Sequence, residues 1–181
     1  MPKSTKAAPA ADQLQEDEQP FLDHLEAINN AYYDQIKIAD QKAAFIFTFI
    51  LAFLISSAEA SNVFKMQRYL TGSWPLVVLS AVLAIALAVS LVSVILVVLP
   101  RHRPTKATSL YWGAWSASNR QKFIAAHEAR DPDYLFNEYL VNIDNLALIN
   151  RSKYFHLGYS FRGLIVAVLA YLALLVVGSA A

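Results

Sequence analysis

Five polar side chains in this sequence have the types needed to hold a phosphorylated ligand: Asp40, Lys42, Asn145, Arg151 and Lys153. Ammonium and guanidinium groups donate charge-assisted hydrogen bonds to phosphate oxygens, and a neighbouring carboxylate or amide can orient such donors. The alternative interpretation is a structural ion pair together with basic side chains that reach lipid headgroups, which is the commoner fate of charges at a surface. The residue types alone leave both interpretations open.

No residue pattern in the sequence predicts catalysis. The chain has no cysteine, which excludes disulfides, thiolate catalysis and cysteine-ligated metal sites. Its four histidines are not spaced like zinc ligands, and the common phosphate-binding, dinucleotide-binding and esterase motifs are absent. We therefore predict that the protein is not an enzyme and that it binds neither a metal nor a cofactor.

The elements that must position these side chains are dominated by three apolar runs. We predict transmembrane helices at residues 43–60, 74–99 and 163–179, because the apolar core of each run contains no charged residue. The first and third are short for a hydrocarbon core of roughly 30 Å at about 1.5 Å per residue. Pumps and secondary transporters usually place ionisable groups at mid-membrane depth, so uncharged spans disfavour both classes.

A long polar helix is expected before the first span and another before the third. Pro20 and the tripeptide at 131–133 are typical helix starts, and no breaker separates either helix from the span that follows. Asn29 lies in an apolar seam with 3-4 spacing, which faces a partner helix. A shorter helix is expected at 119–130. The predicted fold class is an all-α membrane protein whose first and third spans are continuous with long cytoplasmic helices that pack together.

The distribution of Lys and Arg predicts the orientation. The connection between the first two spans carries only Lys65 and Arg68, and the other thirteen basic residues lie on the opposite side. The positive-inside rule then gives a multi-pass protein of the bacterial inner membrane with a cytoplasmic N-terminus and a periplasmic C-terminus. The predicted order is a disordered cytoplasmic tail at 1–19, a cytoplasmic helix at 20–42, the first span, a periplasmic loop at 61–73, the second span, a cytoplasmic helical region at 100–162 and the third span.

Short motifs stand at the membrane ends of all three predicted spans. They are Ile38–Ala44 before the first span, Leu110–Gly113 after the second, and Asn142–Asp144 through Lys153–Tyr154 before the third. In this order and placement they resemble the transmembrane effectors of Pycsar systems, the PycTM family. The similarity covers about residues 22–177.

The resemblance implies an antiphage role. In such systems a uridylate or cytidylate cyclase encoded nearby makes cyclic UMP or cyclic CMP on infection, the effector responds, and loss of inner-membrane integrity kills the infected cell. The implied partners are therefore the lipid bilayer, a cyclic pyrimidine nucleotide and, functionally, this cyclase. On the motif positions, Lys42 and Lys153 would contact the phosphate, and Asp40 and Asn145 would have an orienting role. Arg151 is a further candidate phosphate donor from its residue type and position alone. We also expect a homo-oligomer, and we expect no nucleic-acid partner.

Two other functions fit the same spans. One is a structural or scaffolding inner-membrane subunit that dimerises through its cytoplasmic helices and binds no small ligand. The other is a constitutive channel, which would conduct without a ligand. The uncharged spans argue against a hydrated pore in the resting state, so the scaffold is the stronger of these two alternatives.

Overall fold

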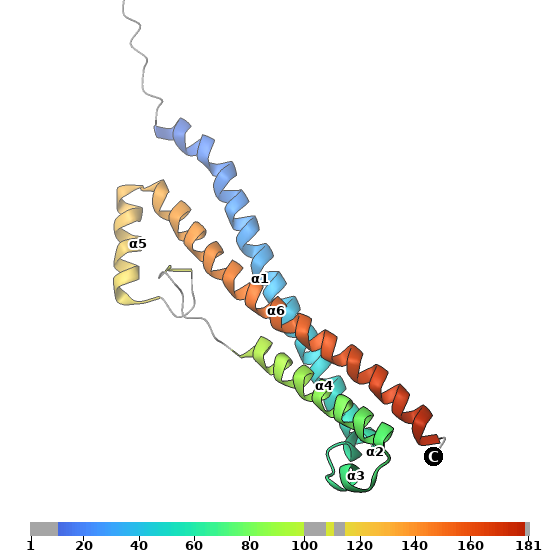
Figure 1. Cartoon of the computed structure of the whole chain (residues 1–181). Coiled ribbons are helices and arrows are strands. Elements are labelled where there is room, and N and C mark those ends of the chain that lie inside the picture. The colour runs from blue at the N-terminus through green and yellow to red at the C-terminus, as the bar shows by residue number, and fades with distance from the viewer. Residues whose placement is uncertain (1–10, 100–107, 111–114, 180–181) are drawn as a thin grey trace, which may run out of the picture. The chain divides into compact units, whose positions relative to one another are not determined.

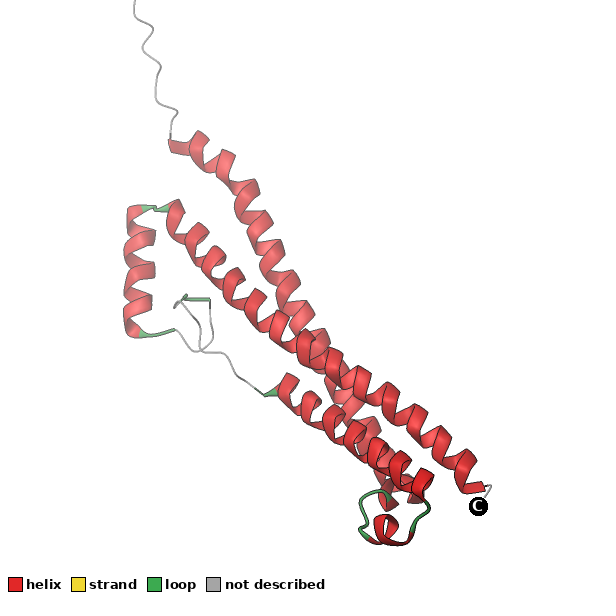
Figure 2. Cartoon of the chain, in the orientation of Figure 1, coloured by secondary structure: helices red, strands yellow, loops and turns green. Residues whose placement is uncertain are grey.

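The computed structural model describes residues 11–99, 108–110 and 115–179, and this part of the chain is helical without a β-strand (Figure 2). The all-α fold class predicted from the sequence is therefore confirmed. Along the described residues run α1 (Ala11–Ser56), α2 (Ala58–Asn62), α3 (Gln67–Thr71), α4 (Trp74–Val98), α5 (Ala117–Ala129) and α6 (Pro132–Ser179), as Figure 1 shows.

Three of the described helices are long and apolar enough to cross a membrane. Their qualifying segments are Gln19–Ser56 in α1, Trp74–Val98 in α4 and Asp133–Gly178 in α6. The segment in α4 is the most apolar, with a mean hydropathy of 3.1. The three predicted membrane helices are thus confirmed, and α1 and α6 each extend far beyond the length that a bilayer requires.

The start of α1 differs from the prediction. The helix begins at Ala11, so residues 11–19 are helical where a disordered tail was expected, and Pro20 lies inside the helix instead of in its first turn. Ala, Gln, Leu and Glu, which fill most of this segment, are among the best helix formers, and they extend the helix in spite of the proline. The remainder of the expected tail, residues 1–10, lies outside the described residues.

The end of α1 also differs, because the first membrane helix stops at Ser56 and not at residue 60. Ser57 adopts an extended backbone conformation, with φ −103° and ψ 113°, and its hydroxyl accepts a 3.2 Å hydrogen bond from the amide of Ala60. A serine in this geometry caps a new helix instead of continuing the old one. The predicted connection at 61–73 therefore contains the end of α2 and the whole of α3.

Capping side chains set the starts of α5 and α6. Ser116 accepts a hydrogen bond from the amide of Asn119 and begins α5, two residues ahead of the predicted start at 119. Arg130 adopts a left-handed conformation, with φ 51°, and ends that helix. The carboxylate of Asp131 accepts a 3.1 Å hydrogen bond from the amide of Asp133, which fixes the first turn of α6.

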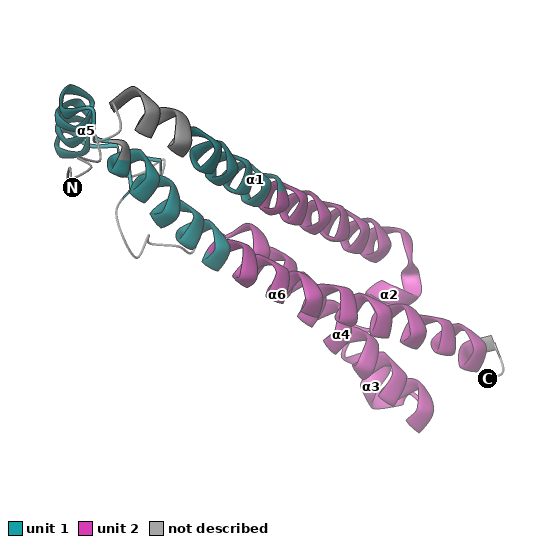
Figure 3. Cartoon of the chain, turned by 90° about the horizontal axis from the view of Figure 1, so that it is seen from above, with its two compact units in different colours: residues 1–34, 102–148 teal, residues 35–101, 149–181 magenta. Residues whose placement is uncertain are grey.

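The chain divides into two compact units, coloured separately in Figure 3, and α1 and α6 contribute residues to both. Unit 1 contains the described residues of 1–34 and 102–148, and unit 2 contains residues 35–101 and 149–181, again as far as they are described. Unit 2 includes the apolar parts of α1, α4 and α6. Its core is built from aliphatic side chains of these three helices, among them Ile50, Leu83, Leu87, Val94 and Leu174.

Candidate functional site

Lys153 joins three helices within unit 2. Its ammonium forms an ion pair with the carboxylate of Asp40 on α1 and donates a 2.9 Å hydrogen bond to the carbonyl oxygen of Val97 on α4. The side chain of Lys153 is 16% exposed and that of Asp40 is 42% exposed. Val97 lies in the last turn of α4, where a helix carries unsatisfied carbonyls and negative partial charge, so a cation is favoured there.

Amide and phenol groups extend this polar cluster along α1 and α6. The amide nitrogen of Asn150 donates a 2.7 Å hydrogen bond to the side-chain oxygen of Gln35, and the hydroxyl of Tyr154 lies 3.4 Å from the backbone oxygen of Gln35. Among the described residues, the Oδ1 atom of Asn150 is buried and has no hydrogen-bond partner. We call the set of Gln35, Asp40, Asn150, Lys153 and Tyr154 the Lys153 cluster.

Lys42 and Arg151 differ from Lys153. Both side chains are exposed, and in the described part of the chain no ion pair or hydrogen bond joins either of them to another residue. Each is close in sequence to a member of the Lys153 cluster, Lys42 to Asp40 and Arg151 to Asn150. Cations of this kind can bind an anion without first breaking an internal ion pair. Lys153, in contrast, already forms an ion pair with Asp40 and a hydrogen bond to Val97.

Asn145 belongs to unit 1, where it is buried at 4% exposure on α6. One turn before it, the buried amide of Asn142 donates a 2.7 Å hydrogen bond to the side-chain oxygen of Asn29 on α1. The Oδ1 atom of Asn142 is buried and unpartnered among the described residues. The sequence had placed Asn29 in a seam facing a partner helix, and the amide it contacts is on α6.

Other polar groups of unit 1 surround the same stretch of α6. Burial and the negative charge of Glu26 raise the pKa of Tyr139 above its ordinary value of 10.0. The carboxylate of Glu138 accepts hydrogen bonds from the backbone amide and the hydroxyl of Ser109, the latter at 2.7 Å. These contacts hold residues 108–110. The rest of the predicted aromatic motif, Tyr111 to Gly113, lies outside the described residues.

Small residues bring α4 and α6 into close contact, a feature that the sequence analysis missed. The hydroxyl of Ser90 donates a 2.9 Å hydrogen bond to the backbone oxygen of Ser160. A methyl group added at Gly163 would lie 3.0 Å from the backbone oxygen of Ala86 and 3.1 Å from the backbone nitrogen of Ser90. The spacing of Ser160, Gly163, Ala167 and Ala170 is typical of close helix packing in membranes and was the available signal.

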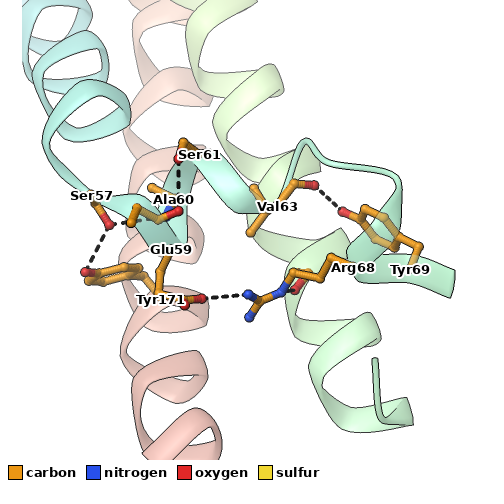
Figure 4. A network of polar contacts seen from close by, with 10 residues as sticks. Ser57, Glu59, Ala60, Ser61, Val63, Arg68, Tyr69 and Tyr171 are labelled. Atoms are coloured by element: carbon orange, nitrogen blue, oxygen red, sulfur yellow. Dashed lines mark hydrogen bonds and ion pairs between the residues drawn. The ribbon is translucent and has the colours of Figure 1, made fainter. Parts of the chain in front are cut away.

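A second polar network lies at the other end of the α1 and α4 spans (Figure 4). Arg68 forms a 2.8 Å ion pair with Glu59 and also donates a 2.8 Å hydrogen bond from Nε to the buried hydroxyl of Ser80. The hydroxyls of Ser57 and Tyr171 are 3.2 Å apart and join the end of α1 to α6. Unit 2 therefore has polar ties at both ends of its apolar core.

Comparison with known proteins identifies the family of this chain. Residues 24–179 match the family model for the Pycsar effector protein domain, PycTM, whereas no curated protein and no solved structure matches. The matched region holds α4, α6, the part of α1 from residue 24 onward and all five predicted site residues. It supports a role as an antiphage defence effector that is a transmembrane protein and not a known enzyme. A match over most of the chain shows that this protein belongs to the PycTM family of Pycsar effectors.

Proposed function

We propose that the protein is activated by a cyclic pyrimidine nucleotide, cyclic UMP or cyclic CMP, and then impairs the integrity of the bacterial inner membrane. The observation that carries the proposal is the family match over residues 24–179, which includes helices long and apolar enough to cross the membrane. The nucleotide would come from a partner pyrimidine cyclase produced in the same cell. Death of the infected cell before phage maturation is the expected outcome.

The distribution of basic residues supports a cytoplasmic N-terminus and a periplasmic C-terminus. Lys65 and Arg68 are the basic residues between α1 and α4, so this connection would face the periplasm. The Lys153 cluster, near the C-terminal end of α4, would then lie at the cytoplasmic surface. A nucleotide made in the cytoplasm would reach it without crossing the membrane.

The ligand phosphate is assigned in this proposal to exposed cations near the Lys153 cluster. Lys42 and Arg151 are exposed and lack an internal ion pair in the described residues, so they would bind the phosphate directly. Lys153 and Asp40 already bind one another, so a phosphate that competes for Lys153 would weaken the tie to Val97 as well. The expectation that Asn145 orients the ligand stays a prediction from the sequence, because Asn145 belongs to unit 1 and the Lys153 cluster to unit 2.

The mechanism would be a shift between two populations of the same assembly. Each of α1 and α6 is a single helix from unit 1 into its apolar span, so a displacement of its first half can be carried into the membrane. A ligand shifts such an equilibrium only by its difference in affinity for the two states. The difference in affinity would arise because the phosphate can bind Lys153 only in the state in which its ammonium has left Asp40 and Val97.

The experiment is dye release from liposomes that contain the purified full-length protein. Cyclic UMP, cyclic CMP, cyclic AMP and cyclic GMP are added separately, and an empty liposome sample controls for the nucleotides themselves. Release with one pyrimidine nucleotide alone is the expected result and names the signal. No release with any of them, although the protein is correctly inserted, would favour the scaffolding subunit, and release without any nucleotide would favour a constitutive channel.

A further inference from the structure

The connection between α1 and α4 folds back onto the apolar helices of unit 2. Arg68 on α3 donates a 2.8 Å hydrogen bond to the hydroxyl of Ser80, which is fully buried and lies six residues beyond Trp74, the first residue of α4. Val63, between α2 and α3, is 1% exposed and belongs to the same aliphatic core as Leu83 on α4. These contacts hold α3 beside the first turns of α4 (Figure 4).

Three polar side chains of this connection are satisfied within the protein. Glu59 and Arg68 form a 2.8 Å ion pair, which leaves the side chain of Arg68 only 18% exposed. The hydroxyl of Tyr69 donates a 2.6 Å hydrogen bond to the backbone oxygen of Val63. These groups therefore fix the fold of the connection and are not the surface that it presents to its surroundings.

Large apolar side chains form the outer surface of the same connection. Phe64 is 55% exposed, Met66 is 73% exposed, and Leu70 and Trp74 are each 78% exposed. Met66 and Leu70 are one helical turn apart, so they lie on one face of α3. We call these four side chains the α3 apolar surface. Exposed apolar side chains that gather in this way mark a surface that contacts a partner.

The exposed side of α4 indicates which partner this is. Trp74 begins a stripe of exposed apolar side chains that recur every three or four residues along α4, which are Val78, Val82, Ile85 and Val89. This helix is long and apolar enough to cross a membrane, so the stripe faces lipid. The α3 apolar surface continues the stripe beyond Trp74, and lipid is the partner that the two surfaces share.

The length of α4 gives the depth of that contact. Its 25 residues span about 37 Å at about 1.5 Å per residue, more than the roughly 30 Å of a hydrocarbon core. The first turns of α4, and α3 beside them, would thus stand in the interfacial layer. Tryptophan is enriched in that layer, and a lysine there lays its stem on apolar groups and its ammonium among the headgroups. Lys65 is exposed between Phe64 and Met66 in the sequence.

We propose that the α3 apolar surface inserts into the interfacial layer of the phospholipid bilayer, on the side of the membrane where α4 begins. The connection between α1 and α4 is then an anchor in one leaflet and not a loop in water. It fixes the depth of both helices at the end of unit 2 opposite the Lys153 cluster. This contact needs no nucleotide, so it goes beyond the proposed function and is tested without it.

The test places a fluorescent bimane label at single positions of the full-length protein in phospholipid vesicles. The chain has no cysteine, so Met66→Cys and Leu70→Cys each carry one thiol. Iodide quenches a label that faces water, and lipids brominated near the headgroup end of their acyl chains quench a label in the interfacial layer. Gln67→Cys is the matched control, because Gln67 is an exposed polar residue of α3 next to Met66. Val78→Cys is the lipid-facing reference on α4.

The labels at positions 66 and 70 are expected to emit at shorter wavelength than the label at position 67. They should lose most of their fluorescence to brominated lipid, as the label at position 78 does, and little to iodide. Quenching of both by iodide as strongly as at position 67 would overturn the proposal, because the surface would then face water. Labels that neither reagent quenches would overturn it as well, since protein and not lipid would then cover the surface.

Discussion

The ammonium of Lys153 on α6 donates a 2.9 Å hydrogen bond to the carbonyl oxygen of Val97 on α4. The same group forms an ion pair with Asp40 on α1, so one side chain ties the three apolar helices of unit 2 together at one end. The backbone carbonyls in the last turn of a helix have no hydrogen-bond donor within the helix. A lysine that donates to one of them also places a positive charge at the negative end of the helix dipole, which is stabilising. The position of Lys153 thereby aligns α6 with α4.

Lys153→Met should lower the free energy of unfolding by about 2 kcal/mol, because Val97 loses its donor and Asp40 loses its counter-ion. Asp40→Asn should cost less than about 1 kcal/mol, since Asp40 is partly exposed and the bond from Lys153 to Val97 remains. Denaturant unfolding in detergent micelles measures both. Equal losses for the two variants would mean that the contact with Val97 contributes little.

Gly163→Ala should destabilise the protein by about 1 to 3 kcal/mol, because the added methyl group meets the backbone of α4 at 3.0 to 3.1 Å. Gly158→Ala is the control on the same helix, since nothing lies within 4 Å of a methyl group placed there. That variant should be neutral or more stable by up to about 1 kcal/mol, as expected for alanine in a helix. Thermal unfolding compares the two, and a destabilised Gly158→Ala would contradict this packing.

The buried amide pair of unit 1 gives a third prediction. Asn142→Leu alone should cost about 1 to 3 kcal/mol, because Asn29 is left without its donor. The double variant with Asn29→Leu should recover most of this loss, since two apolar side chains can replace a buried polar pair. A double-mutant cycle in unfolding free energy measures the coupling, and additive losses would show that the two amides act independently.

The two partners of the ion pair in Figure 4, Arg68 and Glu59, should differ in how much their substitution lowers the free energy of unfolding. Arg68→Met removes both the pair with Glu59 and the bond to the buried Ser80, and should cost about 1.5 to 3 kcal/mol. Glu59→Gln removes only a partly exposed carboxylate and should cost less than about 1 kcal/mol. The same unfolding assay ranks the variants. A larger effect for Glu59→Gln would place the main interaction elsewhere.

Removal of one exposed cation near the Lys153 cluster should weaken the response to nucleotide. Lys42→Gln and Arg151→Gln should each raise the nucleotide concentration needed for half-maximal dye release by about ten-fold, the loss expected for one charge-assisted hydrogen bond to phosphate. Lys37→Gln is the control, because Lys37 is also an exposed lysine on α1 and is not assigned to the ligand. An unchanged half-maximal concentration for either variant removes that residue from the proposed site.

The sequence was sufficient to predict the helices because their signals are local. Uncharged length identified the α4 span, and the proline and carboxylates at 131–133 identified the start of α6, where Asp131 caps the first turn. The interruption at Ser57 was missed, since a serine among apolar residues reads equally well as a helical residue. The early start of α1 was missed because Pro20 was taken as its first turn.

The register between helices was not predictable in the same way. The ion pair of Asp40 with Lys153 joins residues far apart in the chain, and it was only one of two interpretations for those side chains. No local pattern in the sequence indicates that Lys153 also contacts the backbone oxygen of Val97. The small residues around Gly163 carried the relevant signal for the close packing of α4 and α6.

The most direct test of nucleotide-triggered membrane damage is entry of propidium into bacteria that express this protein together with a pyrimidine cyclase. A catalytically inactive cyclase serves as the matched control. We predict that propidium enters only the cells with the active cyclase, as its cyclic nucleotide accumulates. Equal entry with both cyclases, or entry with neither at full expression of the membrane protein, would contradict the account.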